Sequence, residues 1–160
     1  MADQPDDKAI ARWHRRFAVD FNNRAWELSE AATRSPSDDE EMLDAAHGAA
    51  LHWSKVGTEL NAARAQMLLG HVHALLGHGD VAMQFAGASF AYFASHDCAE
   101  WERAFAHAVL ANAASAAGNA DVHWRHHAIA KDIGATLSNA EEREIFEATF
   151  RRVPLPRSTQ

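Results

Sequence analysis

The chain has 160 residues, of which 48% are apolar and 23% charged, and its formal net charge is −7 at pH 7. This length and balance predict one folded domain over residues 1–160 and exclude a largely disordered chain. The acidic charge disfavours nucleic acid as a partner, because most of the surface would repel phosphates.

The sequence also bears on compartment. No apolar run approaches the roughly 20 residues that a membrane-spanning helix needs. Residues 1–7 are polar and acidic, without the basic start and apolar stretch of a secretory signal. The single cysteine, Cys98, excludes an internal disulfide and fits a reducing environment. We therefore expect a cytoplasmic protein with no membrane partner.

The first two predicted helices cover residues 7–34 and 38–56. Abundant alanine and sparse β-branched residues favour helix along the whole chain. An apolar stripe at helical spacing marks the first helix, and it consists of Trp13, Phe17, Phe21, Ala25 and Leu28. Pro36 lies in the turn, and Ser37 with Glu40 has the spacing of a capping box.

Four further helices are expected over residues 58–77, 80–96, 98–117 and 120–134. They form two pairs, each joined by a turn. The two turns begin at Gly77 and Gly118, which lie 41 residues apart, and each leads to an aspartate, Asp80 or Asp121. Glycine tolerates the left-handed backbone that commonly ends a helix, so both helices should stop there.

A seventh helix is predicted over residues 139–152. Ser138 and Glu141 have capping-box spacing at its start, and Phe146 and Phe150 give it an inward face. An unpaired last helix suits the end of an array of helix pairs, because it covers the final apolar face. Residues 153–160, which include two prolines, are expected to be a disordered tail.

Aligning the turns with Pro36 extends the 41-residue period to three units. The columns that keep one residue class are Leu28, Leu69 and Leu110; Ser29, Gly70 and Ala111; Met42, Met83 and Trp124; Ala46, Gly87 and Ala128; and Asp39, Asp80 and Asp121. Small residues at a recurring position indicate that helices approach closely there, and large apolar residues fill the space beside them.

These units resemble the tetratricopeptide repeat family, whose first helix carries a Leu-Gly pair, then a turn glycine and an Asp-led second helix. Leu69, Gly70, Gly77 and Asp80 match that pattern, and the resemblance spans about residues 18–152. It implies an all-α fold, a right-handed superhelix of antiparallel helix hairpins. The 41-residue unit exceeds the usual length of about 34, so longer helices are expected.

In this family the first helices of successive units line a concave groove that often takes an extended peptide. Carried over position by position, the resemblance gives three rows, which are Asn23, Arg64 and Phe105; Trp26, Met67 and Ala108; and Glu30, His71 and Asn112. Polar members can bond a peptide backbone, and aromatic members supply rigid apolar area. The residues predicted to bind a partner are Asn23, Trp26, Arg64, His71, Phe105 and Asn112. The alternative is that the large side chains only pack between helices.

The resemblance therefore favours a non-enzymatic module that binds a peptide or protein segment, or a second copy of the chain, without cofactor, metal or catalytic residues.

Eleven histidines leave a second interpretation open, a metal-binding or sensing protein. His123 and His127 are four residues apart, the spacing of two metal ligands on a helix, and imidazoles also suit pH sensing. A third reading is a cysteine-dependent enzyme, because Cys98 would lie in the first turn of a helix, where the thiol pKa falls.

Overall fold

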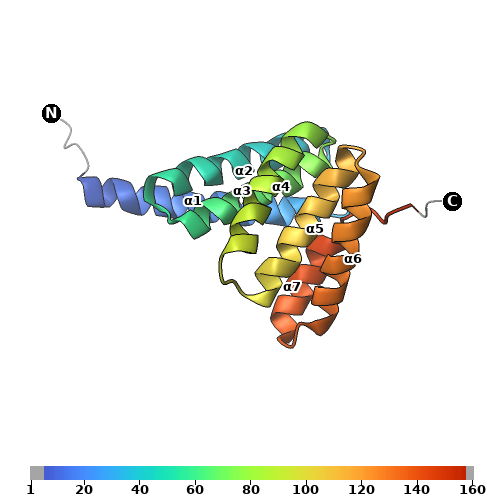
Figure 1. Ribbon diagram of the computed structural model, residues 1–160. Coiled ribbons are helices and arrows are strands. Elements are labelled where there is room, and N and C mark those ends of the chain that lie inside the picture. The colour runs from blue at the N-terminus through green and yellow to red at the C-terminus, as the bar shows by residue number, and fades with distance from the viewer. Residues whose placement is uncertain (1–5, 158–160) are drawn as a thin grey trace.

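The computed structural model describes residues 6–157, and within that range it contains seven helices and no strand. The helices are α1 (Asp7–Glu30), α2 (Pro36–Val56), α3 (Glu59–Leu75), α4 (Gly79–Ser95), α5 (Glu100–Ala116), α6 (Ala120–Thr136) and α7 (Ala140–Phe150) (Figure 1). All seven predicted helices are present, which confirms the all-α class.

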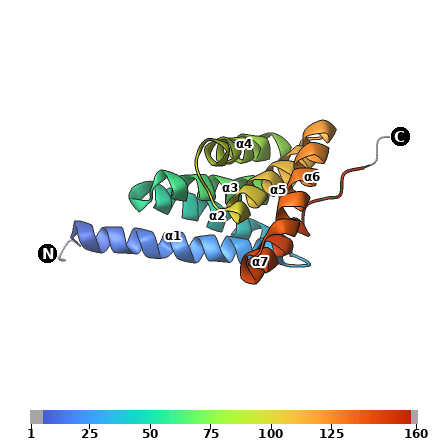
Figure 2. The same cartoon turned by 60° about the horizontal axis from the view of Figure 1, so that its bottom comes forward.

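Consecutive helices pack as three hairpins, α1 with α2, α3 with α4, and α5 with α6. Contacts between the start of α1 and the end of α2, such as His14 with His52, show that the first hairpin is antiparallel. The helices α1, α3 and α5 also touch one another in chain order. Helix α7 contacts α5 and α6 and reaches the carboxyl end of α1 (Figure 2).

The turns at Gly77 and Gly118 are two copies of one structure. Their φ angles are 77° and 75°, the left-handed region that favours glycine. One residue further on, the backbone N–H of His78 bonds the carbonyl of His73, and that of Asn119 bonds the carbonyl of Ala114. This six-residue closure satisfies carbonyls at the helix end, so the predicted helix stops are confirmed.

The first hairpin turns differently from the sequence-based expectation. Helix α1 ends at Glu30, four residues earlier than predicted, and a segment through Ser35 precedes α2. Ser35 caps α2 by accepting the backbone N–H of Asp38, whose carboxylate accepts the backbone N–H of Ser35. Pro36 then occupies the first helical position, where its missing N–H costs nothing. The capping box predicted at Ser37 and Glu40 is therefore wrong.

One other predicted cap is displaced, and α5 starts two residues later than predicted. Helix α5 begins at Glu100, and the backbone N–H of Ala99 donates to the carboxylate of Glu102. At α7 the cap is Asn139, which accepts the backbone N–H of Glu142, in place of Ser138 with Glu141. Several polar residues compete at each start, and the sequence pattern does not rank them.

The small-residue columns have two outcomes. A Cβ built on Gly70 would meet the backbone nitrogen of Ala86 at 2.8 Å, so α3 and α4 approach closely, as that column predicts. Nothing lies within 4 Å of a Cβ on Gly87, so no close approach explains that position. A shared residue class therefore does not always report a shared contact.

Part of the predicted disordered tail packs against the fold. Val153 is buried, and the backbone oxygen of Pro154 accepts a hydrogen bond from His123. Residues 158–160 of that tail lie outside the described residues. Within residues 6–157, no helix is both long enough and apolar enough to cross a membrane.

Candidate functional site

The helices α1, α3, α5 and α7 enclose a pocket of about 380 Å³, called here the inner pocket. Its lining residues are Asn22, Trp26, Glu30, Arg64, Met67, Trp101, Phe105, Ile145 and Thr149. The helices α1, α3 and α5 supply most of them because they touch in order, and α7 adds the last wall because it folds back toward α1.

Aromatic rings form the walls of the inner pocket around Phe105, which is only 4% exposed. Trp26 meets Phe105 edge to face, with ring centroids 5.9 Å apart, and Trp101 meets it in the same way at 5.8 Å. Trp101 precedes Phe105 by four residues on α5, so helical geometry puts both on one face. Edge-to-face rings hold each other in fixed orientations, which keeps the pocket open in a defined shape.

Arg64 of α3 is held at the pocket by Glu102 of α5. Its Nε and Nη2 atoms donate to one carboxylate oxygen of Glu102 at 2.8 and 2.6 Å. The Glu102 side chain is 7% exposed, so its charge depends on this guanidinium. The guanidinium also lies 5.6 Å from the ring centroid of Trp101. Glu102 thus neutralises the charge of Arg64. Its two hydrogen bonds use Nε and Nη2, so Nη1 of Arg64 is not bonded to Glu102.

Glu30 is the other charged residue of the lining, and it is half-buried. Burial raises the pKa of its carboxyl group, and the nearby charges of Arg152 and Arg151 oppose that rise, with a smaller effect from the Thr149 hydroxyl. The salt bridges found among residues 6–157 do not include Glu30. Arg152 instead donates to the backbone oxygen of Glu30.

Three of the six residues predicted to bind a partner line the inner pocket, namely Trp26, Arg64 and Phe105. Asn23 is exposed on α1 beside the pocket and does not line it. Trp101, Ile145 and Thr149 were not predicted. Trp101 lies four residues before Phe105, and this helical spacing could have indicated that it shares the same face. Ile145 and Thr149 could not be found in this way, because the return of α7 toward α1 is not part of the repeat.

His71 and Asn112 are buried, which corrects their assignment to the binding surface. Their side chains contact each other, with 3.1 Å between Nδ1 of His71 and Nδ2 of Asn112, and they join α3 to α5 at equivalent positions of two units. The Trp26 ring stacks on His71 with centroids 5.5 Å apart. Burial, and to a smaller extent the charge of Arg34, lower the pKa of His71 to about 4. This buried pair therefore supports Trp26, one of the residues that line the pocket.

Seven of the eleven histidines contact another histidine through ring nitrogens. The pairs are His14 with His52 at 2.8 Å, His107 with His126 at 2.8 Å, and His73 with both His47 at 3.2 Å and His78 at 3.0 Å. Each such contact needs at least one neutral ring, because two imidazolium groups offer only donors to each other. Burial lowers the pKa of His107 to about 4, with help from the charges of His126 and Arg103.

The helix of His123 and His127 does not form the metal pair that their spacing suggested. Nε2 of His123 lies 2.8 Å from the backbone oxygen of Pro154, and the ring of His127 packs on Phe150. The centroids of the two histidine rings are 6.1 Å apart. Among residues 6–157, no three or more histidine, cysteine, aspartate or glutamate side chains gather as metal ligands would.

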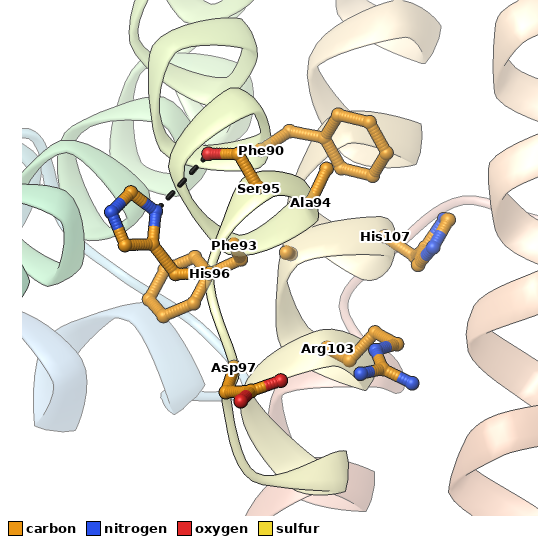
Figure 3. A pocket seen from close by; sticks show the side chains of 9 residues that line it. Phe90, Phe93, Ala94, Ser95, His96, Asp97, Arg103 and His107 are labelled. Carbon is orange, nitrogen blue, oxygen red and sulfur yellow. Dashed lines mark hydrogen bonds between the residues drawn. The ribbon is translucent and has the colours of Figure 1, made fainter.

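A second pocket, of about 310 Å³, lies where α4 leads into α5 (Figure 3). Arg103 and His107 project into it from α5, and Asp97 projects from the connecting loop. Arg103 is paired with Glu100, and His107 contacts His126, so these two side chains of α5 already have partners.

Cys98 lies in the same loop, two residues before α5 begins, so it is not in the first turn of a helix as expected. Its thiol is half-buried and donates to the backbone oxygen of Phe93 at 3.7 Å. This arrangement gives no support to an activated nucleophile.

The chain is therefore an all-α protein of helix hairpins. The first helix of each hairpin, together with α7, lines the aromatic inner pocket. No family model, curated protein or solved structure matches the chain.

Proposed function

We propose that the protein is a non-enzymatic interaction module of the cytoplasm, built as a right-handed superhelix of tetratricopeptide-like hairpins, that binds a peptide or protein segment in the inner pocket. The observation that carries this proposal is the position of the pocket. It lies where the first helices of the hairpins meet, and three residues that the family resemblance assigns to a binding groove line it.

Two further observations support the repeat on which the proposal depends. The turns at Gly77 and Gly118 have the same backbone bonds 41 residues apart. His71 and Asn112, which are also 41 residues apart, contact each other between α3 and α5. Equivalent positions thus meet across successive hairpins, as they do in a stacked array.

The inner pocket has the chemistry of an anchor site. Rigid aromatic walls bury apolar area of a partner at little entropic cost, because their side chains are already fixed. Arg64 is held in place by Glu102, and its side chain is 43% exposed, so a peptide carbonyl can reach the guanidinium and accept a hydrogen bond from it. One bulky side chain of the partner would fill the pocket while its backbone runs along α1 and α3.

Selection of short random peptides displayed on phage, against the immobilised protein, tests this function. We expect sequences that bind the wild type and lose binding to Ile145→Glu, which puts a charge on a pocket wall where the side chain is 51% exposed. Trp124→Ala is the matched control, because this exposed tryptophan is on α6, away from the pocket. Peptides that bind the wild type and Ile145→Glu equally well would contradict the proposal.

The histidine contacts favour pH sensing as a second candidate function. His73 is buried and joins His47 of α2 to His78, the residue before α4, so its protonation would disturb both hairpins. The test is a titration from about pH 7.5 to 5 followed by tryptophan fluorescence and helix content. A reversible fluorescence change at constant helix content, absent in His73→Gln, would support sensing. A signal that moves only as the helices unfold would reject it.

A further inference from the structure

We propose that the inner pocket takes the side chain of a tryptophan or tyrosine of the bound segment, a neutral aromatic group whose single hydrogen-bond donor is accepted by Glu30. This inference rests on the proposed function and names the chemistry of the anchor. Three properties of the pocket lead to it, which are its walls, its charge balance and the free acceptor positions of the Glu30 carboxylate.

The walls fit a flat aromatic group. Trp26 and Trp101 both pack edge to face with Phe105, and Met67 adds a polarisable side chain that adapts to the occupant. A volume of about 380 Å³ lies at the lower end of the range for ligand pockets, which suits one large side chain. Aromatic rings gain edge-to-face and offset contacts with such walls in addition to the apolar area that they bury.

The charge balance argues against an ionic occupant. The lining carries one positive residue, Arg64, and one negative residue, Glu30. Glu102 compensates Arg64 directly, and Arg152 lies against the backbone of Glu30. A carboxylate entering this site would meet an Arg64 that Glu102 already pairs, and a lysine would meet a Glu30 whose charge Arg152 and Arg151 already offset, so either would lose hydration for little gain. A neutral side chain avoids that cost.

The missing group in the pocket is a hydrogen-bond donor. The Glu30 carboxylate is half-buried and only accepts hydrogen bonds when ionised, and no ion-pair partner lies within 4.0 Å of it among residues 6–157. The nearby Thr149 hydroxyl can satisfy one acceptor position of this carboxylate, and the other positions remain free for a donor from the occupant. Tryptophan N–H and tyrosine O–H combine an aromatic body with a donor, whereas phenylalanine and leucine lack the donor.

The test uses small probes observed through the indole N–H signals of the protein in NMR spectra. N-acetyl-tryptophanamide is compared with its benzothiophene analogue, in which sulfur replaces the ring N–H. We expect N-acetyl-tryptophanamide to shift the signals of Trp26 and Trp101 but not that of Trp124, and to bind about tenfold more tightly than the analogue. Glu30→Met should remove this tenfold difference, whereas Glu27→Met, at an exposed position on the same helix, should retain it.

Glu30→Gln keeps an acceptor in the pocket and checks the same point if Glu30→Met does not fold. It should preserve part of the preference for the tryptophan probe. Equal affinities of the two probes for the wild type would overturn the inference, as would tighter binding of N-acetyl-lysinamide. If no probe moves Trp26 or Trp101 while displayed peptides still bind in a pocket-dependent way, the inference fails and the proposed function stands. Loss of both kinds of binding rejects both.

Discussion

At the scale of single residues, two glycines and one buried histidine show what residue type alone can indicate. Gly77 and Gly118 were predicted to end helices, and both have the positive φ that this role requires. His71 was predicted to face a partner, yet it is buried against Asn112. The helical period gives the direction of a side chain around its helix, but it does not show which neighbouring element covers that direction.

The two kinds of glycine predict stability changes of opposite sign. Gly77→Ala should lower the free energy of unfolding by about 1 kcal/mol, because alanine is strained at φ 77° although nothing crowds its methyl group. Gly87→Ala should raise it by about 0.5 kcal/mol, because this glycine lies inside α4 with open space around the new methyl group. Urea denaturation of both variants measures the difference. A gain in stability from Gly77→Ala would contradict the left-handed turn.

At the scale of elements, the helices were predictable but their ends and faces were not always so. The predicted apolar stripe of α1 is buried at Ala25 and Leu28, whereas Trp13 is 60% exposed. The reason is the length of the partner helix. Arg15 reaches the last carbonyl of α2, at Val56, so the first turns of α1 extend beyond α2 and have no helix to pack against. The sequence pattern predicted the apolar stripe of α1, and the packing of α2 against α1 determines how much of that stripe is buried.

Helix α7 illustrates how one element completes the site. Phe146 is 2% exposed and packs edge to face with Phe105 and in a stacked arrangement with Phe150. A Cβ on Gly134 of α6 would collide with the same ring, at 2.1 Å. The glycine therefore lets α7 approach α6. Through Phe146, α7 in turn packs against Phe105, which lines the inner pocket.

Neighbouring substitutions on α7 test this role. Phe146→Ala should lower the free energy of unfolding by about 3 to 4 kcal/mol, because it leaves a cavity among rings that cannot easily close it. Ile145→Ala should cost less than about 1 kcal/mol, since that side chain is half exposed. Chemical denaturation gives both values. Similar losses for the two variants would mean that α7 does not contribute its Phe146 face to the core.

At the scale of the whole molecule, contacts between histidines, each of which needs at least one neutral ring, are distributed over every hairpin. Contacts between histidines link α1 with α2, α3 with α2 and with the turn before α4, and α5 with α6. The pKa values of His52, His73, His107, His126 and His127 are all lowered, with burial as the largest cause. Acid should therefore weaken the fold as a whole.

The expected pH dependence has a definite sign. The pKa of His71 is about 4 in the folded chain and near 6.5 when unfolded, so the unfolded chain binds a proton first as the pH falls. The free energy of unfolding should drop between about pH 6.5 and 4, by about 3 kcal/mol from His71 alone. Denaturation curves at several pH values, compared between wild type and His71→Gln, isolate this share. The same pH slope in both proteins would contradict it.

The sequence by itself determined the helices and the two equivalent turns. These depend on local physics, namely helical periodicity, alanine content and the backbone freedom of glycine, and each can be read within one or two turns of chain. Trp26, Arg64 and Phe105 were assigned to one groove by the resemblance to the tetratricopeptide repeat family, carried over position by position, and they line one pocket in the structure.

Only the tertiary structure decided which candidate residues line a pocket and which support it. Burial of His71 and Asn112, the pairing of Arg64 with Glu102 and the wall supplied by Ile145 and Thr149 all come from contacts between helices far apart in the chain. Such contacts depend on which helix ends where and on how α7 returns toward α1. Those outcomes are sums over many packed side chains, and no local pattern encodes them.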